Sequence, residues 1–426
     1  MAIKRRDFLN LTTKATVATG LFTTLSACNT SSHSEKQQVI SSESNLKNKT
    51  DGVKPITVND RLQRIEKAQN LMIQQGIDAL IIDSGTTLNY FTGIYWWPSE
   101  RTMVAVIPAK GDPFYICPAF EEDRLRENVT IGNKINIWQE DENPFKLIID
   151  SLGISSGNIA LEDRLRFFIM DGLRKVAPNL NFVTDSISKT CRLIKSSSEI
   201  ALMQKAFDIT AEAIKYTIGQ LKEGMSQNEV SGLVAKAHQD LGAMHDFALV
   251  LFGVSSSFPH GSKIPQTLKK GDVVLMDCGC RVHGYSSDIT RTIVFGVEPT
   301  AKQKDIWNLE KKAQEAGFAA AQLGATCGSV DDASRKVITD AGFGPDYKVP
   351  GLPHRTGHGI GMDGHEFPYM VKNNPQVLEP GMCFSIEPTI ALPSEFGIRL
   401  EDCVYMTENG PQWFIQPSPS INQPFH

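Results

Sequence analysis

Hydrophobic positions near residue 60 follow a helical spacing. From Asp60 they recur every three or four residues, and Gly76 then supplies a stop signal, which together predict a helix. The β-branched run 77–82 predicts a strand after this helix, and residues 85–87 predict a turn. The predicted buried face of the helix comprises Leu62, Ile65, Ala68, Leu71 and Met72.

Shorter periodic segments continue this alternation. Residues 103–117 predict a hairpin that turns at 110–112, because two strand-like runs flank Lys-Gly-Asp. Residues 158–165 predict a further strand, and 167–176 predict a second helix. Helices that alternate with strands in this way predict an α/β domain over residues 58–187.

A second unit is expected over residues 188–426. Ser198 is a candidate entry to a long helix, and Ser226 with Glu229 has the sequence of a capping box that opens another. Strand-like runs dominate after residue 271, with helices predicted over 305–323 and 330–341. No internal repeat is evident, and the pattern predicts an α+β domain.

Composition fits two globular domains and narrows the classes of function. The chain has 426 residues, of which 41% are hydrophobic and 21% charged, with a formal net charge of −5. No basic patch indicates nucleic-acid binding, and no hydrophobic run reaches the ~18 residues that a membrane-spanning helix needs.

The first 28 residues resemble an export signal. Residues 4–9 contain a paired arginine followed by Phe-Leu, residues 15–25 are modestly apolar, and residues 25–28 resemble a lipobox ending at Cys28. We expect export by the twin-arginine route, lipidation at Cys28 and a periplasmic or cell-envelope lipoprotein that touches the membrane only through its lipid. The polar residues 29–57 predict a flexible tether. The alternative is a chance basic N-terminus on a cytoplasmic enzyme.

Cysteine usage does not indicate a disulfide framework. Eight cysteines are present, and seven irregularly spaced ones remain once Cys28 is assigned to the lipid. Cys278, Cys383 and Cys403 lie near acidic residues, so thiolate ligation of a metal is conceivable. We disfavour it because paired Cys-x-x-Cys units are missing from the sequence.

Four acidic residues stand out because they interrupt apolar, strand-like runs. A carboxylate in such a run is costly to bury unless a positive charge meets it. Bound divalent metal ions supply that charge most simply, and they indicate hydrolytic chemistry. A turn at Gly284 is expected to place the first two across a hairpin from each other. The four are Asp277, Asp288, Glu387 and Glu401.

A glycine-rich segment supplies a candidate nitrogen ligand. His354 and His358 are four residues apart, but the prolines and glycines around them predict an extended segment that packs closely around a ligand. We expect His358 to be the ligand, and His260, His354 and His365 to face the substrate or support the ligands. Arg399, on the same strand face as Glu401, either anchors a substrate carboxylate or orients a ligand.

The number of acidic groups sets the expected metal content. Four carboxylates and one imidazole carry too much negative charge for one divalent ion, so two divalent metal ions are expected. Oxygen-rich ligation with one nitrogen suits Mn, which we expect first, and also Co, Zn or Fe.

Several motifs together resemble a known superfamily. They are LNYFTGI (88–94), RLIKSSSEI (192–200), SSSFPHG (255–261), HRTGHGIGMDGHE (354–366), SIEP and GIRLED. This set resembles the pita-bread metallopeptidases, and within them the prolidase and aminopeptidase P branch with its creatinase-type N-terminal domain. The resemblance covers residues 58 to about 418 and implies a curved antiparallel sheet covered by helices.

The resemblance also implies residue roles. Asp277 would hold one metal, Asp288 and Glu401 would bridge both, and His358 would hold the other metal with Glu387. Glu387 would also carry a proton toward the leaving nitrogen. The remaining candidates would contact substrate or ligands: His260 and His365 the reacting carbonyl, His354 the pocket wall, and Arg399 substrate or ligand. Thr389 departs from the glycine that often follows Glu-Pro in the family, which puts the local pocket width in doubt.

The function implied is metal-dependent hydrolysis of the bond before proline in short peptides, by a homodimer outside the cytoplasm. Whether it is a dipeptidase or an aminopeptidase is left open. A small-molecule amide hydrolase or lyase on the same metal-retaining fold, of the ectoine-derivative or dimethylsulfoniopropionate type, is the main alternative. A non-catalytic, lipid-anchored binding protein is the third, and the complete ligand set argues against it.

Overall fold

The computed structural model describes residues 45–426, so the predicted export signal, Cys28 and residues 29–44 of the predicted tether lie outside the described residues. The rest of the predicted tether lies against folded parts of the protein. The backbone N–H of Lys49 donates to the carbonyl oxygen of Leu241 at 2.9 Å, and the Ile56 side chain is buried. Within residues 45–426, no helix combines the length and the apolar character needed to cross a membrane.

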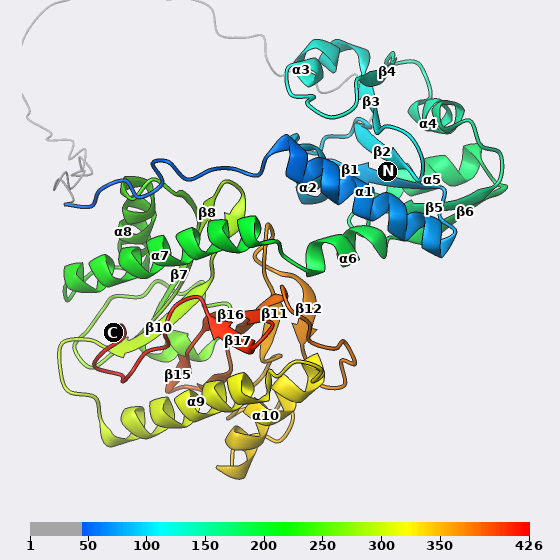
Figure 1. The fold of residues 1–426 in the computed structure, drawn as a ribbon. Coiled ribbons are helices and arrows are strands. Elements are labelled where there is room, and N and C mark those ends of the chain that lie inside the picture. Colours follow the sequence, from blue (N-terminus) through cyan, green and yellow to red (C-terminus); the bar gives the residue numbers. More distant parts are fainter. Residues whose placement is uncertain (1–44) are drawn as a thin grey trace, which may run out of the picture. The chain divides into compact units, whose positions relative to one another are not determined.

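The N-terminal domain is built around a six-stranded mixed sheet (Figure 1). Its strands are β1 (Ala79–Asp83), β2 (Val104–Pro108), β3 (Phe114–Pro118), β4 (Lys134–Trp138), β5 (Gly157–Leu161) and β6 (Leu180–Thr184). Their order is β4-β3-β2-β1-β5-β6. The predicted hairpin is confirmed, since β2 and β3 pair antiparallel, whereas β1, β5 and β6 pair parallel. Helices between the strands make this the expected α/β domain.

The first helix, α1 (Val58–Gln75), is capped as its sequence suggests. Thr57 and Asp60 form a capping box, and Gly76 ends the helix with φ 65°. One predicted face residue is wrong: Leu62 is 48% exposed, whereas Arg64 is buried. The other helices are α2 (Thr86–Thr92), a 3₁₀ turn (Ala119–Glu121), α3 (Glu122–Arg126), α4 (Pro144–Leu152), α5 (Phe167–Val176) and α6 (Ile187–Leu193).

The turn predicted at residues 85–87 is also wrong, because α2 begins at Thr86. Leu88, Tyr90 and Phe91 of this short helix are buried in the core, and Gly93 ends it with φ 80°. Tertiary packing therefore overrides a local turn signal here. The helix predicted over residues 167–176 is confirmed as α5.

Two helix pairs recur in the C-terminal domain: α7 (Ser197–Gln220) with α8 (Gln227–Asp240), and α9 (Ala301–Ala320) with α10 (Cys327–Asp340). Ser196, not Ser198, caps α7, because its hydroxyl accepts the N–H of Glu199. The capping box predicted at Ser226 is confirmed. In each pair the second helix begins beside an isolated bridge, Ser226 to Thr267 and Thr326 to Val377. The structure thus contains a repeated helix pair that was not evident in the sequence.

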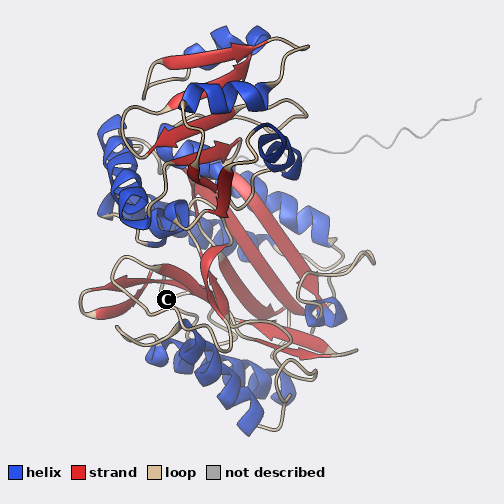
Figure 2. Cartoon of the chain, turned by 90° about the vertical axis from the view of Figure 1, so that its right-hand side faces the viewer, coloured by secondary structure: helices blue, strands red, loops and turns tan. Residues whose placement is uncertain are grey.

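Three sheets complete the C-terminal domain (Figure 2). Helices α7 and α8 pack on the first sheet, of order β10-β8-β7, while α9 and α10 pack on strands of the others. The strands are β7 (Met244–Phe252), β8 (Val273–Val282), β9 (Tyr285–Ser286), β10 (Ile289–Val294), β11 (Gly357–Gly359), β12 (Glu366–Met370), β13 (Cys383–Ile386), β14 (Thr389–Leu392), β15 (Phe396–Arg399), β16 (Asp402–Thr407) and β17 (Gly410–Trp413). A 3₁₀ segment, η2 (Gly253–Ser257), follows β7.

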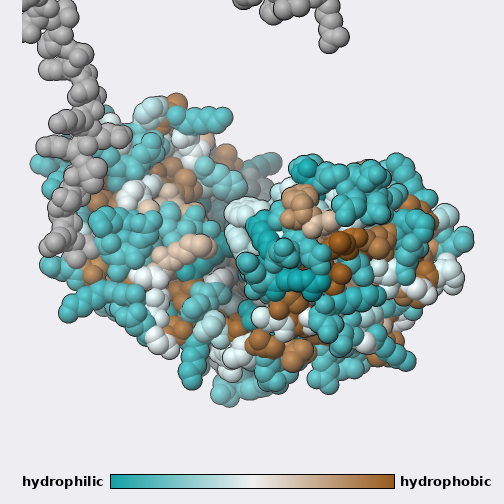
Figure 3. All heavy atoms as spheres, turned by 90° about the horizontal axis from the view of Figure 1, so that it is seen from above, coloured by the Kyte–Doolittle hydropathy of each residue, from teal (hydrophilic) through white to brown (hydrophobic). Residues whose placement is uncertain are grey.

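On the face shown in Figure 3 the surface is mostly hydrophilic, and its hydrophobic side chains lie in small groups. Several large aromatic side chains of the N-terminal domain are strongly exposed, among them Trp97 at 70% and Phe167 at 76%. Such scattered exposure is usual for a folded domain.

Candidate metal centre

Two aspartates approach one another across the β8–β10 hairpin. Val282 pairs with Tyr285, and the two turn residues His283 and Gly284 have φ 47° and 86°, as a tight hairpin requires. Asp277 lies on β8, opposite Thr290, and Asp288 directly precedes β10. The predicted hairpin turn at Gly284 is confirmed.

The extended segment around His358 depends on glycine for close backbone contact. A Cβ atom at Gly357 would lie 1.9 Å from the carbonyl oxygen of Ser385 on the neighbouring strand β13. The predicted extended segment is confirmed as β11. We expected its glycines to let the backbone pack closely around a ligand, but Gly357 instead allows close contact with the neighbouring strand β13. The Nδ1 atom of His358 lies 3.1 Å from the carbonyl oxygen of Gly359, which leaves Nε2 to face the acidic groups.

Two glutamates reach His358 from the ends of other strands. Oε1 of Glu387, which follows β13, lies 3.1 Å from Nε2 of His358. Oε1 of Glu401, between β15 and β16, lies 4.0 Å from the same nitrogen, and Oδ2 of Asp288 lies 3.8 Å from it. The side chains of these four residues therefore converge from four different stretches of the sequence. They are Asp288, His358, Glu387 and Glu401.

All five predicted ligands meet in one place. Three overlapping groups have ligand atoms within 4.8 Å of one another: Asp277, Asp288 and Glu401; His358, Glu387 and Glu401; and Asp288, His358 and His365. Within the described part of the chain, three buried carboxylate oxygens here have no hydrogen-bond partner: Asp277 Oδ1, Asp288 Oδ1 and Glu401 Oε1. Unpartnered buried acceptors are what a bound cation would satisfy, so the donor set fits divalent metal ions.

Electrostatics in this cluster reflect the crowding of acidic groups. Burial and the neighbouring carboxylates raise the pKa of Asp288 and of Glu401 well above the usual range. Burial also acts to raise the pKa of Glu387, but the charge and hydrogen bond of His358 outweigh it and lower that pKa to about 2. The protein alone therefore leaves two of these carboxyl groups without a compensating charge.

Arg399 contacts the acidic cluster itself. It forms an ion pair with Asp277, its Nε donates to the hydroxyl of Thr290 at 3.1 Å, and Nη1 donates to the carbonyl oxygen of Pro259 at 3.1 Å. The same Thr290 hydroxyl donates to Glu401 at 2.7 Å. Of the two roles left open for Arg399, these contacts favour orientation of a ligand.

The three other histidines occupy different positions. His365 is exposed, and its ring stacks on that of His358 with 3.7 Å between centroids. His354 places Nδ1 2.7 Å from the carbonyl oxygen of Arg355 and Nε2 3.0 Å from the Thr389 hydroxyl. Thr389, where the family often has glycine, is thus a partner for this ring.

His260 is exposed on the segment after η2. Burial is the main cause that lowers the pKa of His354 and that of His365, the latter to about 4, and His260 contributes to both shifts. His260 therefore lies close enough to His354 and to His365 to interact electrostatically with each of them. Arg399 ties the His260 segment to the acidic cluster through the carbonyl of Pro259.

Some supporting residues carried no signal in the sequence. The Gln314 side-chain amide on α9 donates to Asp402 Oδ2 at 3.0 Å and reaches the carbonyl oxygen of Leu400 at 3.3 Å. The buried Arg291 donates to the carbonyl oxygen of Glu401 at 3.1 Å and to Asp402 at 2.7 Å. The strand alternation that marks Asp288 also points to Thr290, two residues later, but nothing local indicates Gln314.

The cysteines are buried and free throughout residues 45–426. Burial raises the pKa of Cys278 and of Cys403 well above the usual range, and that of Cys383 to about 12. No cysteine belongs to the three candidate metal-binding groups found among residues 45–426, which agrees with the sequence-based preference against thiolate ligation.

Comparison with known proteins places the two domains. Residues 201–408 match the metallopeptidase family M24, and residues 64–194 match the creatinase/prolidase N-terminal domain. The chain is 33% identical over 366 residues to an Xaa-Pro dipeptidase of Lactobacillus delbrueckii subsp. lactis, which covers 84% of this chain and 98% of the relative.

Solved structures give the same result. The fold is similar to that of a prolidase from Thermococcus sibiricus, with TM-score 0.77, 29% identity and coverage of 84% of this chain and 97% of the other. It is also similar to dipeptidase PepE from Mycobacterium ulcerans, with TM-score 0.79, 30% identity and coverage of 85% and 97%. The expected combination of an α/β N-terminal domain with a pita-bread catalytic domain is confirmed. The chain belongs to metallopeptidase family M24, in its prolidase and aminopeptidase P branch.

Proposed function

We propose that this protein is an Xaa-Pro dipeptidase that works with two divalent metal ions, Mn being the first candidate. The observation that carries the proposal is the convergence of five ligand-type side chains with three buried carboxylate oxygens that lack a partner in the described chain. The relative from Lactobacillus delbrueckii subsp. lactis is named an Xaa-Pro dipeptidase, which supports the same substrate class. The ligands would be Asp277, Asp288, His358, Glu387 and Glu401.

Metal ions bound there would polarise the scissile carbonyl and lower the pKa of an attacking water. Side chains of the protein would transfer the proton, bind the reacting carbonyl and orient the ligands. Glu387 would accept a proton from the attacking water and carry it toward the leaving nitrogen. His365 and His260 are exposed and can donate hydrogen bonds to the reacting carbonyl. Arg399 would hold Asp277 in place.

The first experiment measures hydrolysis of Ala-Pro, Ala-Pro-Ala and Ala-Ala by residues 29–426, without metal and with Mn, Co, Zn or Fe. Mn-dependent cleavage of Ala-Pro alone is expected. Cleavage of Ala-Pro-Ala would instead indicate an aminopeptidase. If folded, metal-loaded protein cleaves none of the three, the peptidase proposal is wrong, and a small-molecule amide hydrolase or lyase takes its place.

A ligand variant separates catalysis from folding. Asp288→Asn keeps the size of the side chain but removes its charge, so turnover should be abolished while the unfolding temperature of the metal-free protein is maintained or raised. Asp305→Asn, at an exposed position of α9, is the matched control and should retain full turnover. Wild-type turnover in Asp288→Asn would contradict the assignment of this ligand.

We also propose export as a lipoprotein and assembly as a homodimer. The support for export is the paired arginine of residues 4–9 and the lipobox-like residues 25–28, all outside the described residues. Full-length protein should fractionate with membranes and incorporate labelled fatty acid, and Cys28→Ser should lose both properties. Sedimentation of residues 29–426 as a monomer would contradict the dimer.

A further inference from the structure

A buried ionic network surrounds the segment that carries His365. The guanidinium of Arg192, at the end of α6, donates to Asp363 at 2.7 Å and also pairs with Glu366. Lys195 pairs with the second oxygen of Glu366 at 2.7 Å. Burial acts to raise the pKa of Glu366, but Lys195 and Arg192 outweigh it and lower that pKa, so the group is charged. The network therefore holds two ionised carboxylates by strong, charge-assisted hydrogen bonds.

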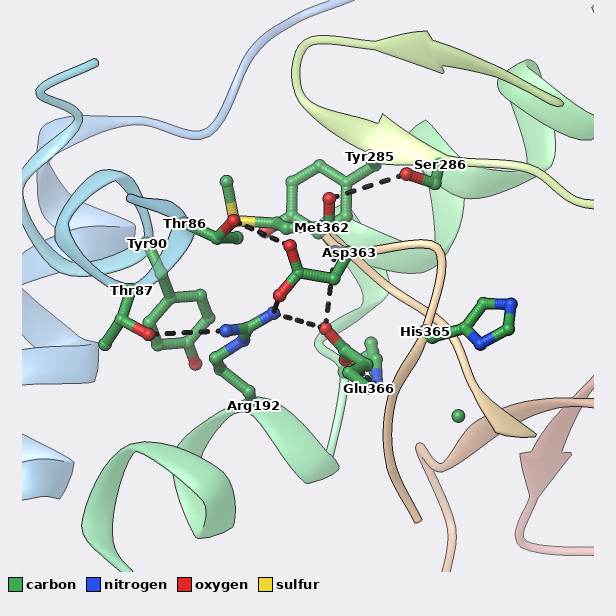
Figure 4. Close-up of polar contacts among 12 residues, drawn as sticks. Thr86, Thr87, Tyr90, Arg192, Tyr285, Ser286, Met362, Asp363, His365 and Glu366 are labelled. Carbon is green, nitrogen blue, oxygen red and sulfur yellow. Dashed lines mark hydrogen bonds and ion pairs between the residues drawn. The ribbon is translucent and has the colours of Figure 1, made fainter. Parts of the chain in front are cut away.

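The two carboxylates flank a short stretch of backbone. Only Gly364 and His365 lie between Asp363 and Glu366, so the network fixes the chain on both sides of His365. Figure 4 shows the His365 ring pointing away from the network, while Asp363 and Glu366 point into it. The ring then stacks on His358, one of the proposed metal ligands.

The N-terminal domain also contacts the segment around His365. The hydroxyl of Thr86, the first residue of α2, donates to the other oxygen of Asp363 at 2.7 Å (Figure 4). Arg164, which follows β5, lies 3.2 Å from Asp363 and donates to the carbonyl oxygen of His365 at 3.3 Å. Thr86 and Arg164, together with Arg192 of α6, thus hold from the N-terminal domain a segment that belongs to the other domain.

The hairpin tip holds the same segment from the catalytic domain. The backbone N–H of Ser286, on β9, donates to the carbonyl oxygen of Gly361 at 2.8 Å, and its hydroxyl donates to that of Met362 at 3.4 Å. The hairpin that carries Asp277 and Asp288 and the N-terminal domain therefore meet on residues 361–366 (Figure 4). Side chains fixed by surrounding contacts keep catalytic geometry most reliably.

We propose that Thr86 and Arg164 of the N-terminal domain are positioning residues, which act through Asp363 and the backbone of residue 365 to hold His365 against His358. This inference rests on the proposed function, in which His365 contacts the reacting carbonyl. It gives the N-terminal domain a role in turnover that needs no contact of its own with the metal ions.

Peripheral variants test the inference without removing the core of the network. Loss of Arg192 or Asp363 would leave a buried charge unpaired and endanger folding. Thr86→Val removes one hydroxyl at nearly constant volume, and Arg164→Met removes an exposed guanidinium. Lys189→Met is the matched control, because Lys189 lines one cavity together with Thr86 and Arg164 but pairs with Asp163, outside the 361–366 segment.

We expect Thr86→Val and Arg164→Met each to lower kcat on Ala-Pro by about tenfold, because small displacements of a catalytic group are costly. KM and bound Mn should stay within about twofold of wild type if the metal centre itself is untouched. In a His365→Ala background, neither substitution should lower kcat further. An equal loss of kcat in that background, or in Lys189→Met, would overturn the inference.

A spectroscopic measurement keeps this test independent of peptidase activity. In metal-free, histidine-labelled protein, the ring resonance of His365 can be assigned by its loss in His365→Ala. Thr86→Val and Arg164→Met should shift that resonance, and Lys189→Met should not. An unchanged resonance in both variants would overturn the positioning role. Failure of the wild type to cleave Ala-Pro, with the resonance shifts present, would instead count against the proposed function alone.

Discussion

The side-chain amide nitrogen of Gln314 lies 3.3 Å from the carbonyl oxygen of Leu400, the residue immediately before Glu401. The same nitrogen lies 3.5 Å from the carbonyl oxygen of Ile386, the residue before Glu387. One buried amide therefore joins the two backbone segments that carry the glutamates of the proposed metal centre. Outer-shell contacts of this kind set how ligands are aimed.

Replacement of this amide should weaken metal binding. Gln314→Leu leaves the carbonyl groups without their donor and frees both segments, so we expect Mn affinity to fall about tenfold to a hundredfold. Isothermal titration of metal-free protein with Mn measures this directly. Gln322→Leu, at an exposed position, is the control and should bind as wild type does. Equal affinities in the two variants would show that Gln314 has no role in ligand placement.

Removal of metal should make stability depend on pH. In the metal-free protein, burial and neighbouring carboxylates raise the pKa of Asp288 and of Glu401 above their values in the unfolded chain. The folded state then binds more protons than the unfolded state, so its stability falls as pH rises through and above the ordinary carboxylate range. Thermal unfolding with a chelator should give a lower Tm at about pH 8 than at about pH 6, and added Mn should reduce the difference. A metal-free Tm that rises from about pH 6 to about pH 8 would contradict the proposed destabilisation by burial and crowding of carboxylates at Asp288 and Glu401.

Glu162 gives a second pH-dependent contribution to stability. Burial raises its pKa to about 7, although hydrogen bonds from Thr87 and from the Asp83 backbone oppose the shift. Because the folded pKa exceeds the ordinary value of 4.5, Glu162 costs stability increasingly between about pH 4.5 and pH 7. Glu162→Gln keeps the acceptor oxygen and should stabilise the protein by about 3 kcal/mol at pH 8.

Denaturant unfolding at two pH values tests the Glu162 prediction. The stabilisation should be present at about pH 8 and should nearly vanish at about pH 3.5, where the wild-type carboxyl group is mostly protonated in both states. Glu127→Gln, at an exposed carboxylate, should change stability little at either pH. A stabilisation of the same size at both pH values would mean that charge burial is not its cause.

His238 should contribute to the loss of stability in acid. Burial, and then the neighbouring His245, lower its pKa to about 3, and its Nε2 lies 3.1 Å from the Thr210 hydroxyl. A histidine held neutral contributes stability that is lost as pH falls from about 6.5 toward 3, because the unfolded chain takes up the proton. Relative to wild type, His238→Gln should therefore lose stability near pH 8 and recover about 4 kcal/mol as the pH falls through this range. Acid unfolding followed by circular dichroism, with His426→Gln as control, measures the shift.

Local signals in the sequence predicted the elements whose causes are local. The helix at residues 167–176, the hairpin at 103–117 and the capping box at Ser226 all follow from spacing and turn chemistry within a few residues. The end of α1 at Gly76 has the same origin, since glycine accepts the positive φ that ends a helix.

The errors have distant causes. Arg64 is buried on α1 because its guanidinium lies 3.1 Å from Glu199 and 2.7 Å from the hydroxyl of Tyr285, both in the C-terminal domain. Helix α2 replaces the predicted turn because its apolar residues find a core to enter. Neither the partners of Arg64 nor the core that receives α2 can be inferred from the neighbouring sequence. Local sequence signals alone therefore assigned both incorrectly.

The candidate site divides in the same way. Acidic residues in apolar runs are conspicuous because burial of an unpaired charge is costly, so Asp277 and Glu401 could be singled out. Gln314 and Thr86 are neutral residues on helices, where they are common, and their importance depends on the carbonyl or carboxylate that they meet after folding. The sequence therefore predicted the cluster of charged residues, but it did not predict the neutral residues whose hydrogen bonds orient the backbone and side chains around that cluster.

The two repeated helix pairs divide the proposed ligands between them. Asp277 and Asp288 follow the first pair, while His358, Glu387 and Glu401 follow the second. Neither half of the domain supplies all five proposed ligands alone. An ion that took ligands from both halves would act as a crosslink between them, so its removal should loosen the contact between the halves.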